Sequence, residues 1–116
     1  MTGVMSGPGF EVVTVLQTPA GSVVELSGEL DAATVPILQD HLSQMIEAGE
    51  RCIVADLSGL TYTDSRGIGT LLAAHQRLSK TGGALFIHRP MPQVARIFGI
   101  TGVADILTER SPATLS

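Results

Sequence analysis

The stretch Cys52–Leu78, CIVADLSGLTYTDSRGIGTLLAAHQRL, decides the fold, because a strand pattern changes to a helix pattern within it. Its first part, Cys52–Leu57, is short and largely apolar, which is typical of a strand covered on both faces. Ser58–Asp64 is polar and predicts a loop. A helix is expected from Ser65 onward, where one mainly apolar face recurs at helical spacing: Ile68, Leu71, Leu72, His75 and Leu78.

The segments before this stretch predict a hairpin and a first helix. Phe10–Thr18 and Ser22–Leu30 are rich in β-branched residues, and the TPAG sequence of Thr18–Gly21 suits a tight turn between them. Thr34 is a suitable N-cap, and Pro36 is tolerated in a first helical turn. The apolar residues of this helix are Leu38, Leu42, Met45 and Ile46.

The segments after it predict a strand, a short helix and a last strand. Gly82–Gly83 ends the central helix, and Ala84–His88 (ALFIH) is typical of a buried strand. A short helix is expected between Pro92 and Gly99, and Ile106–Thr108 is a candidate final strand.

The resulting order, β-β-α-β-α-β-α-β, predicts an α/β fold. An N-terminal hairpin followed by βα units gives a mixed β-sheet, with about three to four helices packed against it. We expect residues 1–9 to be a flexible N-terminal tail, residues 10–110 to form one domain, and residues 111–116 to be a short C-terminal tail.

Composition excludes several classes of protein. The net charge of −4, from 7 Lys+Arg against 11 Asp+Glu, argues against a nucleic-acid binder, which needs a clustered basic surface. No segment approaches the ~20 apolar residues of a membrane span. The N-terminus has no signal-peptide pattern, and the single cysteine, Cys52, cannot form an internal disulfide. We therefore expect a cytoplasmic protein without membrane insertion.

Neither a metal site nor an enzyme is indicated. His41, His75 and His88 are far apart in sequence and have no metal-ligand spacing, so we expect structural or surface roles, no metal and no cofactor. The motif around Ser65 is not Gly-x-Ser-x-Gly. His75 lies about two and a half helical turns beyond Ser65, too far to act as its base. We expect no catalytic residue.

The sequence Asp64–Gly69 (DSRGIG) allows two interpretations from its residues alone. As a helix start, Asp64 or Ser65 caps backbone N–H groups. Gly67 and Gly69 each cost about 0.5–1 kcal/mol relative to alanine in a helix, which asks for close packing or a close partner. As a modification site, Ser65 would carry a phosphate that the helix N-terminus tolerates and a docked partner does not.

Topology brings a second loop to the same place. Gly28–Thr34 follows one predicted strand and Thr61–Gly69 follows another. Sites in such sheets gather where the carboxyl ends of strands meet helix N-termini. We therefore expect Asp31, Asp64 and Ser65 to lie at one end of the sheet.

Four segments together match the pattern of a known family. They are Gly28–Thr34 (GELDAAT), Asp56–Gly69 (DLSGLTYTDSRGIG), the Gly82–Gly83 pair before an apolar strand, and Val94–Gly102 (VARIFGITG). Over about residues 10–110 the chain resembles the STAS-domain family, and within it the small anti-sigma factor antagonists of bacteria. The resemblance implies a STAS-type sheet.

The resemblance also implies a mechanism. Family members bind an anti-sigma factor, a serine-protein kinase with a histidine-kinase-like ATPase fold, and so release the sigma factor for RNA polymerase. The kinase phosphorylates the serine of the Asp-Ser-x-Gly motif, and a phosphatase restores it, in partner-switching circuits of the stress-response type. Carried over, Ser65 is the phosphoacceptor. The implied partner-binding residues are Asp31, Thr34, Asp64, Ser65, Arg66, Gly67, Ile68 and Leu71.

Arg66 departs from the family pattern, since many relatives have Ser or Thr there. Its guanidinium would pair with a phosphate on Ser65, with an acid on the partner, or alter the choice of kinase. The alternative function is a non-switching STAS module, acting as a subunit of a lipid- or anion-transport assembly or of a larger signalling assembly.

Overall fold

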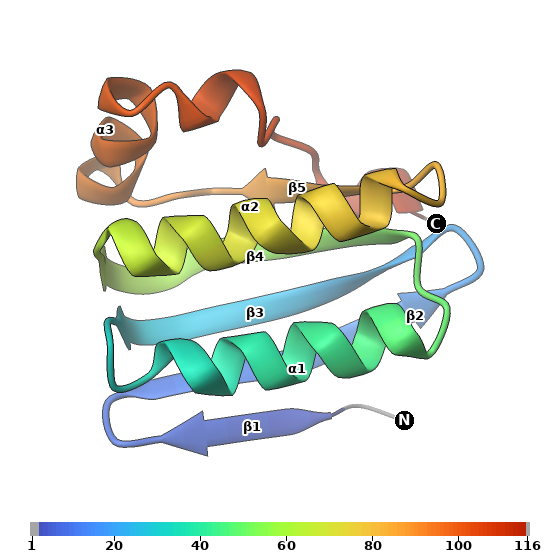
Figure 1. Ribbon diagram of the computed structural model, residues 1–116, viewed down its shortest axis with the longest axis horizontal. Coiled ribbons are helices and arrows are strands. Elements are labelled where there is room, and N and C mark those ends of the chain that lie inside the picture. The colour runs from blue at the N-terminus through green and yellow to red at the C-terminus, as the bar shows by residue number, and fades with distance from the viewer. Residues whose placement is uncertain (1–2, 116) are drawn as a thin grey trace.

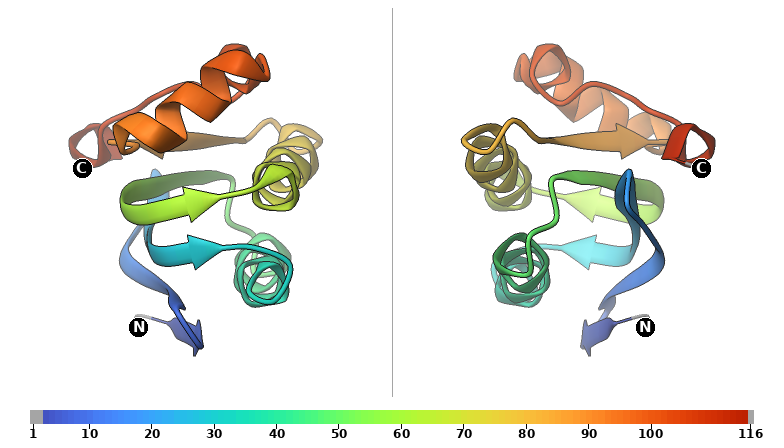
Figure 2. Two further views of the ribbon diagram at one scale, coloured as in Figure 1. Left: turned by 90° about the vertical axis from the view of Figure 1, so that its left-hand side faces the viewer. Right: turned by 90° about the vertical axis from the view of Figure 1, so that its right-hand side faces the viewer.

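A computed structural model describes residues 3–115 as a five-stranded mixed sheet with helices on one face and at one edge (Figures 1 and 2). The strands, which lie in sequence order, are β1 (Val4–Gly7), β2 (Phe10–Thr18), β3 (Gly21–Leu30), β4 (Cys52–Thr63) and β5 (Ala84–His88). The helices are α1 (Val35–Glu47), α2 (Ser65–Ser79) and α3 (Pro92–Ile100), followed by the 3-10 turns η1 (Val103–Asp105) and η2 (Pro112–Leu115).

The direction of the strands confirms the predicted hairpin followed by βα units. β1, β2 and β3 pair antiparallel, whereas β3, β4 and β5 pair parallel. The parallel pairs are joined through α1 and α2, which lie side by side on the same face of the sheet (Figure 2). α3 lies at the β5 edge. None of the helices within residues 3–115 is long and apolar enough to cross a membrane.

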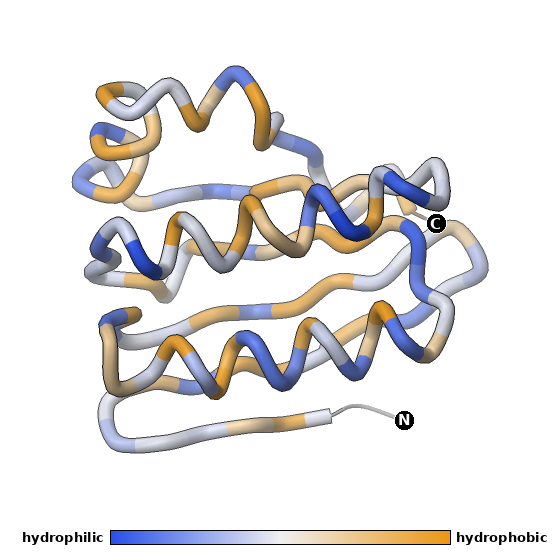
Figure 3. Tube along the Cα trace, viewed as in Figure 1, coloured by the Kyte–Doolittle hydropathy of each residue, from blue (hydrophilic) through white to orange (hydrophobic). Residues whose placement is uncertain are grey.

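The main core lies between the sheet and these two helices. Figure 3 shows apolar and polar positions alternating around α1 and α2, as the predicted helical spacing requires. The apolar side chains that α1 and α2 bury include Leu38, Leu42, Met45, Ile68, Leu71, Ala74 and Leu78. Opposite them, the sheet contributes apolar side chains that include Val24, Leu26, Ile53, Leu57 and Leu85.

The N-terminal segment is not the irregular tail that we expected. Val4–Gly7 forms the edge strand β1, with Val4 opposite Val13 and Gly7 opposite Phe10. Gly9, with a φ of 76°, lies in the turn that follows. β1 has only 4 residues, which are too few to show a periodic pattern in the sequence.

The expected loop Ser58–Asp64 is also wrong, because β4 continues to Thr63. Beyond Asp56 this strand pairs only with β3. Two register shifts between β3 and β4 interrupt the alternation of side chains there. Polar exposed side chains on an extended, irregularly paired strand have the composition of a loop, and that misled the prediction.

The expected strand Ile106–Thr108 does not form. Within the described residues, the only pairing near it is an isolated bridge between Ile87 and Glu109. α3 also continues through Gly99 to Ile100, and Gly102, with a φ of 75°, follows its end. Leu107 is buried although it lies in no strand, so its apolar character reflects packing and not pairing.

The C-terminal segment contributes to the fold more than a tail does. η2 places Leu115, only 1% exposed, against Val23 and Val54. These residues lie on the sheet face that α1 and α2 leave uncovered, where Figure 2 shows the C-terminus. The Thr18 hydroxyl donates a hydrogen bond to the Leu115 carbonyl at 3.2 Å, which holds the segment in place.

Candidate functional site

The carboxyl ends of β3 and β4 meet at one edge of the sheet. Leu30 and Thr63 are the last register pair of these strands, and the Asp64 N–H donates to the Leu30 carbonyl at 3.2 Å. Asp31 therefore begins the loop that leads to α1, and Asp64 is the single residue between β4 and α2, which starts at Ser65 (Figure 1). This placement agrees with the topology predicted from the sequence.

The loop that begins at Asp31 is held by its own side chains. Asp31 Oδ1 accepts hydrogen bonds from the N–H groups of Ala33 and Thr34, at 3.0 and 3.2 Å. The Thr34 hydroxyl donates to the Glu29 carbonyl at 2.9 Å and accepts from the Asp31 N–H at 3.0 Å. Thr34 occupies the N-cap position of α1, as predicted, but its side chain does not cap the helix because the loop uses it.

The start of α2 is capped by Asp64 and not by Ser65. Asp64 Oδ1 accepts from the N–H groups of Arg66 and Gly67, at 2.9 and 3.3 Å. The Asp64 carbonyl accepts from the Ile68 N–H at 3.3 Å. The Ser65 side chain is exposed, and its hydroxyl makes no hydrogen bond within residues 3–115. The cap of α2 therefore does not depend on the Ser65 hydroxyl.

Close packing explains only one of the two glycines at this helix start. A Cβ at Gly67 would lie 2.6 Å from Leu30 Cδ2 and closer still to Thr63 Oγ1, so close packing requires glycine there. Gly69 is exposed and has nothing within 4 Å of a Cβ, so packing does not explain it. Gly69 lies four residues beyond Ser65, on the same face of the helix.

The residues implied by the resemblance divide into an exposed and a buried group. Ser65 and Arg66 are exposed, and Asp31 and Asp64 are partly exposed. The remaining members face the core, with side chains that partners cannot reach in this conformation: Thr34, Gly67, Ile68 and Leu71. These four buried residues add little to the exposed surface.

Two exposed residues beside this group were not among the candidates. Tyr62 is 47% exposed and stands opposite Glu29 in the β3–β4 register, just before the edge. Gly69 was noted for its helix cost but was not assigned to the partner-binding set. An aromatic residue inside an otherwise polar segment was the sequence signal for Tyr62, since exposed aromatics are enriched in protein interfaces.

An ion pair joins buried Asp56 on β4 to Arg89, the residue that follows β5 and whose side chain is 61% exposed. Asp56, with a side chain 5% exposed, accepts from Arg89 Nη2 at 2.9 Å and from the Ser58 N–H at 3.0 Å. Burial acts to raise the pKa of the Asp56 carboxyl, but the hydrogen bonds from Ser58 and Arg89 and the charge of Arg89 outweigh it, so the pKa lies below its ordinary value. Arg89 is the only non-glycine residue within 3–115 with a positive φ, 51°.

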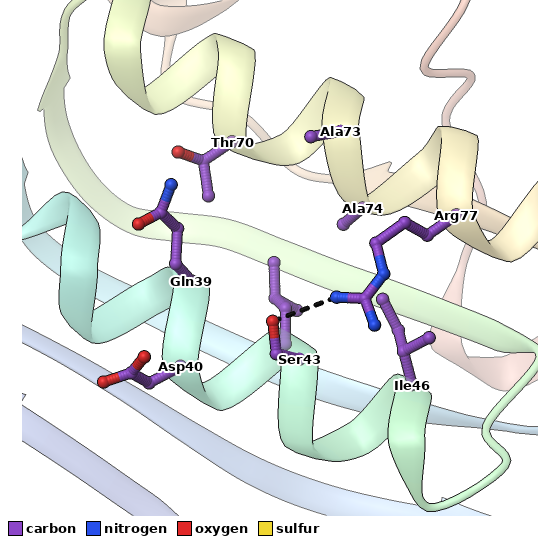
Figure 4. A pocket seen from close by; sticks show the side chains of 9 residues that line it. Gln39, Asp40, Ser43, Ile46, Thr70, Ala73, Ala74 and Arg77 are labelled. Atoms are coloured by element: carbon purple, nitrogen blue, oxygen red, sulfur yellow. Dashed lines mark hydrogen bonds between the residues drawn. The ribbon is translucent and has the colours of Figure 1, made fainter.

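A groove of about 330 Å³ lies between α1 and α2, along the part of α2 from Thr70 to Arg77 (Figure 4). Arg77 crosses it and donates to Ser43 Oγ at 3.0 Å. The Thr70 hydroxyl, which also lines the groove, donates to the Arg66 carbonyl at 2.9 Å. Three of the polar side chains that line the groove, Ser43, Thr70 and Arg77, thus already bond to protein. No set of three metal-ligating side chains occurs within residues 3–115.

Two of the three histidines have structural partners, as expected. His41 Nε2 lies 2.7 Å from the Thr14 hydroxyl in the core, and burial lowers the pKa of His41. His75 Nδ1 accepts from the Leu85 N–H at 3.1 Å. Neither contact directs an imidazole to Ser65.

Known proteins share this sequence pattern and fold. Residues 12–114 match the family described as STAS domain. The chain is 34% identical to an anti-sigma-B factor antagonist of Staphylococcus aureus (strain NCTC 8325 / PS 47) over 84 residues, or 72% of this chain and 78% of the relative. It is 30% identical to an anti-sigma-B factor antagonist of Bacillus subtilis (strain 168) over 95 residues, or 82% and 86%.

A solved structure shows the same fold. The unphosphorylated form of SpoIIAA, an anti-sigma factor antagonist, matches with a TM-score of 0.75 and 24% identity, over 87% of this chain and 89% of that chain. The phosphorylated form of SpoIIAA, described as a Bacillus cell fate determinant, matches with a TM-score of 0.68 over 87% and 92%.

Proposed function

Because the chain belongs to the STAS-domain family, we propose that it is an anti-sigma factor antagonist that is switched off by phosphorylation of Ser65. One observation carries the proposal: the Ser65 hydroxyl is exposed, lacks a hydrogen bond within residues 3–115, and sits between a capping aspartate and a packed glycine. The names of the relatives support the role, and the phosphorylated form of SpoIIAA supports the switch by analogy.

The surface that we assign to the partner is the docking edge, defined by Asp31, Tyr62, Asp64, Ser65, Arg66 and Gly69. Small side chains on one helix face favour a close approach, and Ser65, Gly69 and Ala73 form such a face, all of them exposed. The buried residues Thr34, Gly67, Ile68 and Leu71 keep the edge in a fixed shape. A fixed surface binds with less loss of conformational entropy than a mobile one.

The proposed partner is an anti-sigma factor that is also a serine-protein kinase with a histidine-kinase-like ATPase fold. It would transfer the γ-phosphoryl group of ATP to Ser65 Oγ, with loss of the hydroxyl proton and release of ADP. A phosphoserine phosphatase would hydrolyse the ester. This chain supplies the acceptor hydroxyl and no catalytic group or cofactor. The proposal places the exchange in the bacterial cytoplasm, where sigma factors meet RNA polymerase.

The switch acts on the surface and not on the fold. Before modification Asp31, Asp64 and Arg66 give the docking edge one more negative than positive charge. A phosphate adds about −1.5 to −2 charges at pH 7. Because Asp64 rather than Ser65 caps α2, the helix start does not depend on the Ser65 hydroxyl. Like-charge contacts in an interface cost several kcal/mol, which corresponds to orders of magnitude in affinity.

The test is binding and phosphorylation with candidate cognate kinases, measured by calorimetry and by mapping of the modified residue. Ser65→Asp is expected to weaken the complex at least about tenfold while the Tm stays nearly unchanged. Gln76→Glu is the matched control, since it adds one charge to an exposed position about 16 Å further along α2.

The proposal fails if the kinase that holds the sigma factor neither binds this chain nor modifies Ser65. Capture of transporter subunits in place of an anti-sigma factor would favour the non-switching STAS module. A large loss of Tm in Ser65→Asp would show that Ser65 has a structural role.

A further inference from the structure

The backbone donors at the start of α2 are largely occupied. The first N–H groups of a helix normally remain available to an anion. Here the N–H groups of Arg66 and Gly67 donate to Asp64 Oδ1, and that of Ile68 donates to the Asp64 carbonyl. A phosphate on Ser65 would compete with a carboxylate for them. It therefore needs a positive partner other than the helix terminus.

Arg66 is the only cationic side chain in this first turn, Ser65–Ile68. One guanidinium nitrogen lies 4.0 Å from Asp64 Oδ2, at the outer limit of an ion pair, and the side chain is 64% exposed. An exposed pair of this length is weak, so the guanidinium is easily taken by a stronger acceptor. Arg89, in contrast, pairs with buried Asp56 at 2.9 Å, so its guanidinium already has a close acceptor.

We propose that Arg66 is a positioning residue for phosphorylated Ser65: its guanidinium leaves Asp64 and binds the phosphate oxygens. The inference rests on the proposed phosphorylation of Ser65. A guanidinium presents paired donors that match a phosphate, and such charge-assisted bonds are shorter and stronger than the long contact to Asp64. Arg66 thereby holds the dianion at the docking edge and offsets part of its repulsion from Asp64.

The electrostatic consequence can be measured on the phosphate itself. The second pKa of phosphoserine is ordinarily about 6. A cation bonded to the phosphate favours the dianion and lowers this pKa, whereas removal of the cation leaves the charge of Asp64 unopposed and raises it. At neutral pH, Arg66 thus increases the fraction of phosphoprotein that carries the full double charge.

The experiment uses the full chain with phosphoserine installed at position 65 by semisynthesis, which needs no kinase. The phosphate is titrated by phosphorus NMR in the wild-type sequence, in Arg66→Ser, in Arg66→Lys and in Arg77→Ser. Arg77→Ser removes the same charge from the same helix about 18 Å away, beyond the Debye length of ~8 Å at physiological salt.

Arg66→Ser is expected to raise the phosphate pKa by about 0.5 pH unit, Arg66→Lys by less, and Arg77→Ser not measurably. The difference should shrink in 1 M salt, where the Debye length is about 3 Å. Equal pKa values in wild-type and Arg66→Ser overturn the inference. So does a result in which Arg66→Ser changes only the affinity of the unmodified chain for its partner, which would place Arg66 against an acid of the partner. Neither result bears on whether a kinase modifies Ser65.

Discussion

We expect two glycines in the first turns of α2, Gly67 and Gly69, to respond in opposite ways to substitution by alanine. In Gly67→Ala, the new methyl group would lie 2.6 and 2.8 Å from Leu30 Cδ2 and Cγ, and closer to Thr63 Oγ1. All of these atoms belong to strands β3 and β4, so α2 must move away from the sheet or the Leu30 side chain must change its rotamer. In Gly69→Ala the methyl group meets nothing within 4 Å.

The magnitudes follow from two competing effects. Alanine is favoured over glycine in a helix by about 0.5–1 kcal/mol, and both variants gain this. Overpacking a filled core costs about 1–3 kcal/mol, and only Gly67→Ala has this loss. We expect Gly67→Ala to lower the free energy of unfolding by about 0.5–2 kcal/mol and Gly69→Ala to raise it by about 0.5–1 kcal/mol. In a domain of this size, ~1 kcal/mol shifts Tm by about 4 °C.

Urea unfolding followed by circular dichroism measures both free energies, and equal m-values show that the unfolding reaction is unchanged. A thermal melt gives the Tm difference between the variants, expected to be about 4–12 °C. If the two variants have the same stability, the packing of Gly67 against Leu30 does not constrain the position of α2. The packing of buried residues such as Gly67 would then not fix the shape of the docking edge.

Three further substitutions test other contacts of the fold. Asp56→Asn should reduce the loss of folding stability at acid pH. The folded state lowers the pKa of Asp56, so the carboxylate stabilises the fold above the unfolded pKa of about 3.9. This stabilisation is lost as pH falls through the lower pKa of the folded state. His41→Asn should remove a loss of stability that begins as pH falls below about 6.5, because burial disfavours the protonated imidazole in the folded state; urea unfolding from pH 8 to 5 measures it. Leu115→Ala should cost about 2 kcal/mol, against a small effect of Ile106→Ala at a 51% exposed position, and no difference between them in urea unfolding would mean that η2 does not hold the sheet.

The parts of the fold that the sequence predicts well are those set by local patterns. Ala84–His88 has the same bounds in the sequence prediction and in the structure, because a short apolar run between Gly83 and Arg89 leaves few alternatives. The helical spacing of apolar residues, which is also a local pattern, identified α1 and α2. Parallel pairing of the strands that flank these helices then follows from crossover rules, and it brings Asp31 and Asp64 to one edge.

What could not be predicted depends on contacts between distant residues. The Asp-Ser dipeptide offers two good caps, and only the backbone course after β4 selects Asp64 over Ser65. Thr34 has the right position for a cap, but its hydroxyl donates to the Glu29 carbonyl and does not cap the helix. The strand β4 extends beyond its apolar part because β3 offers it a partner to Thr63.

The contrast between Gly67 and Gly69 connects stability with the proposed function. Glycine at 67 is explained by the fold, but glycine at 69 is exposed, lowers helix stability and has no internal contact that requires it. If a partner approaches the docking edge closely, Gly69→Ala should raise the free energy of unfolding and yet weaken the complex. Gly99→Ala is the matched control, because it makes the same change at an exposed glycine of α3 that also has nothing within 4 Å of a Cβ and lies outside the docking edge. Calorimetric titration of the kinase with both variants measures the effect, and unchanged affinity in Gly69→Ala would exclude Gly69 from the docking edge.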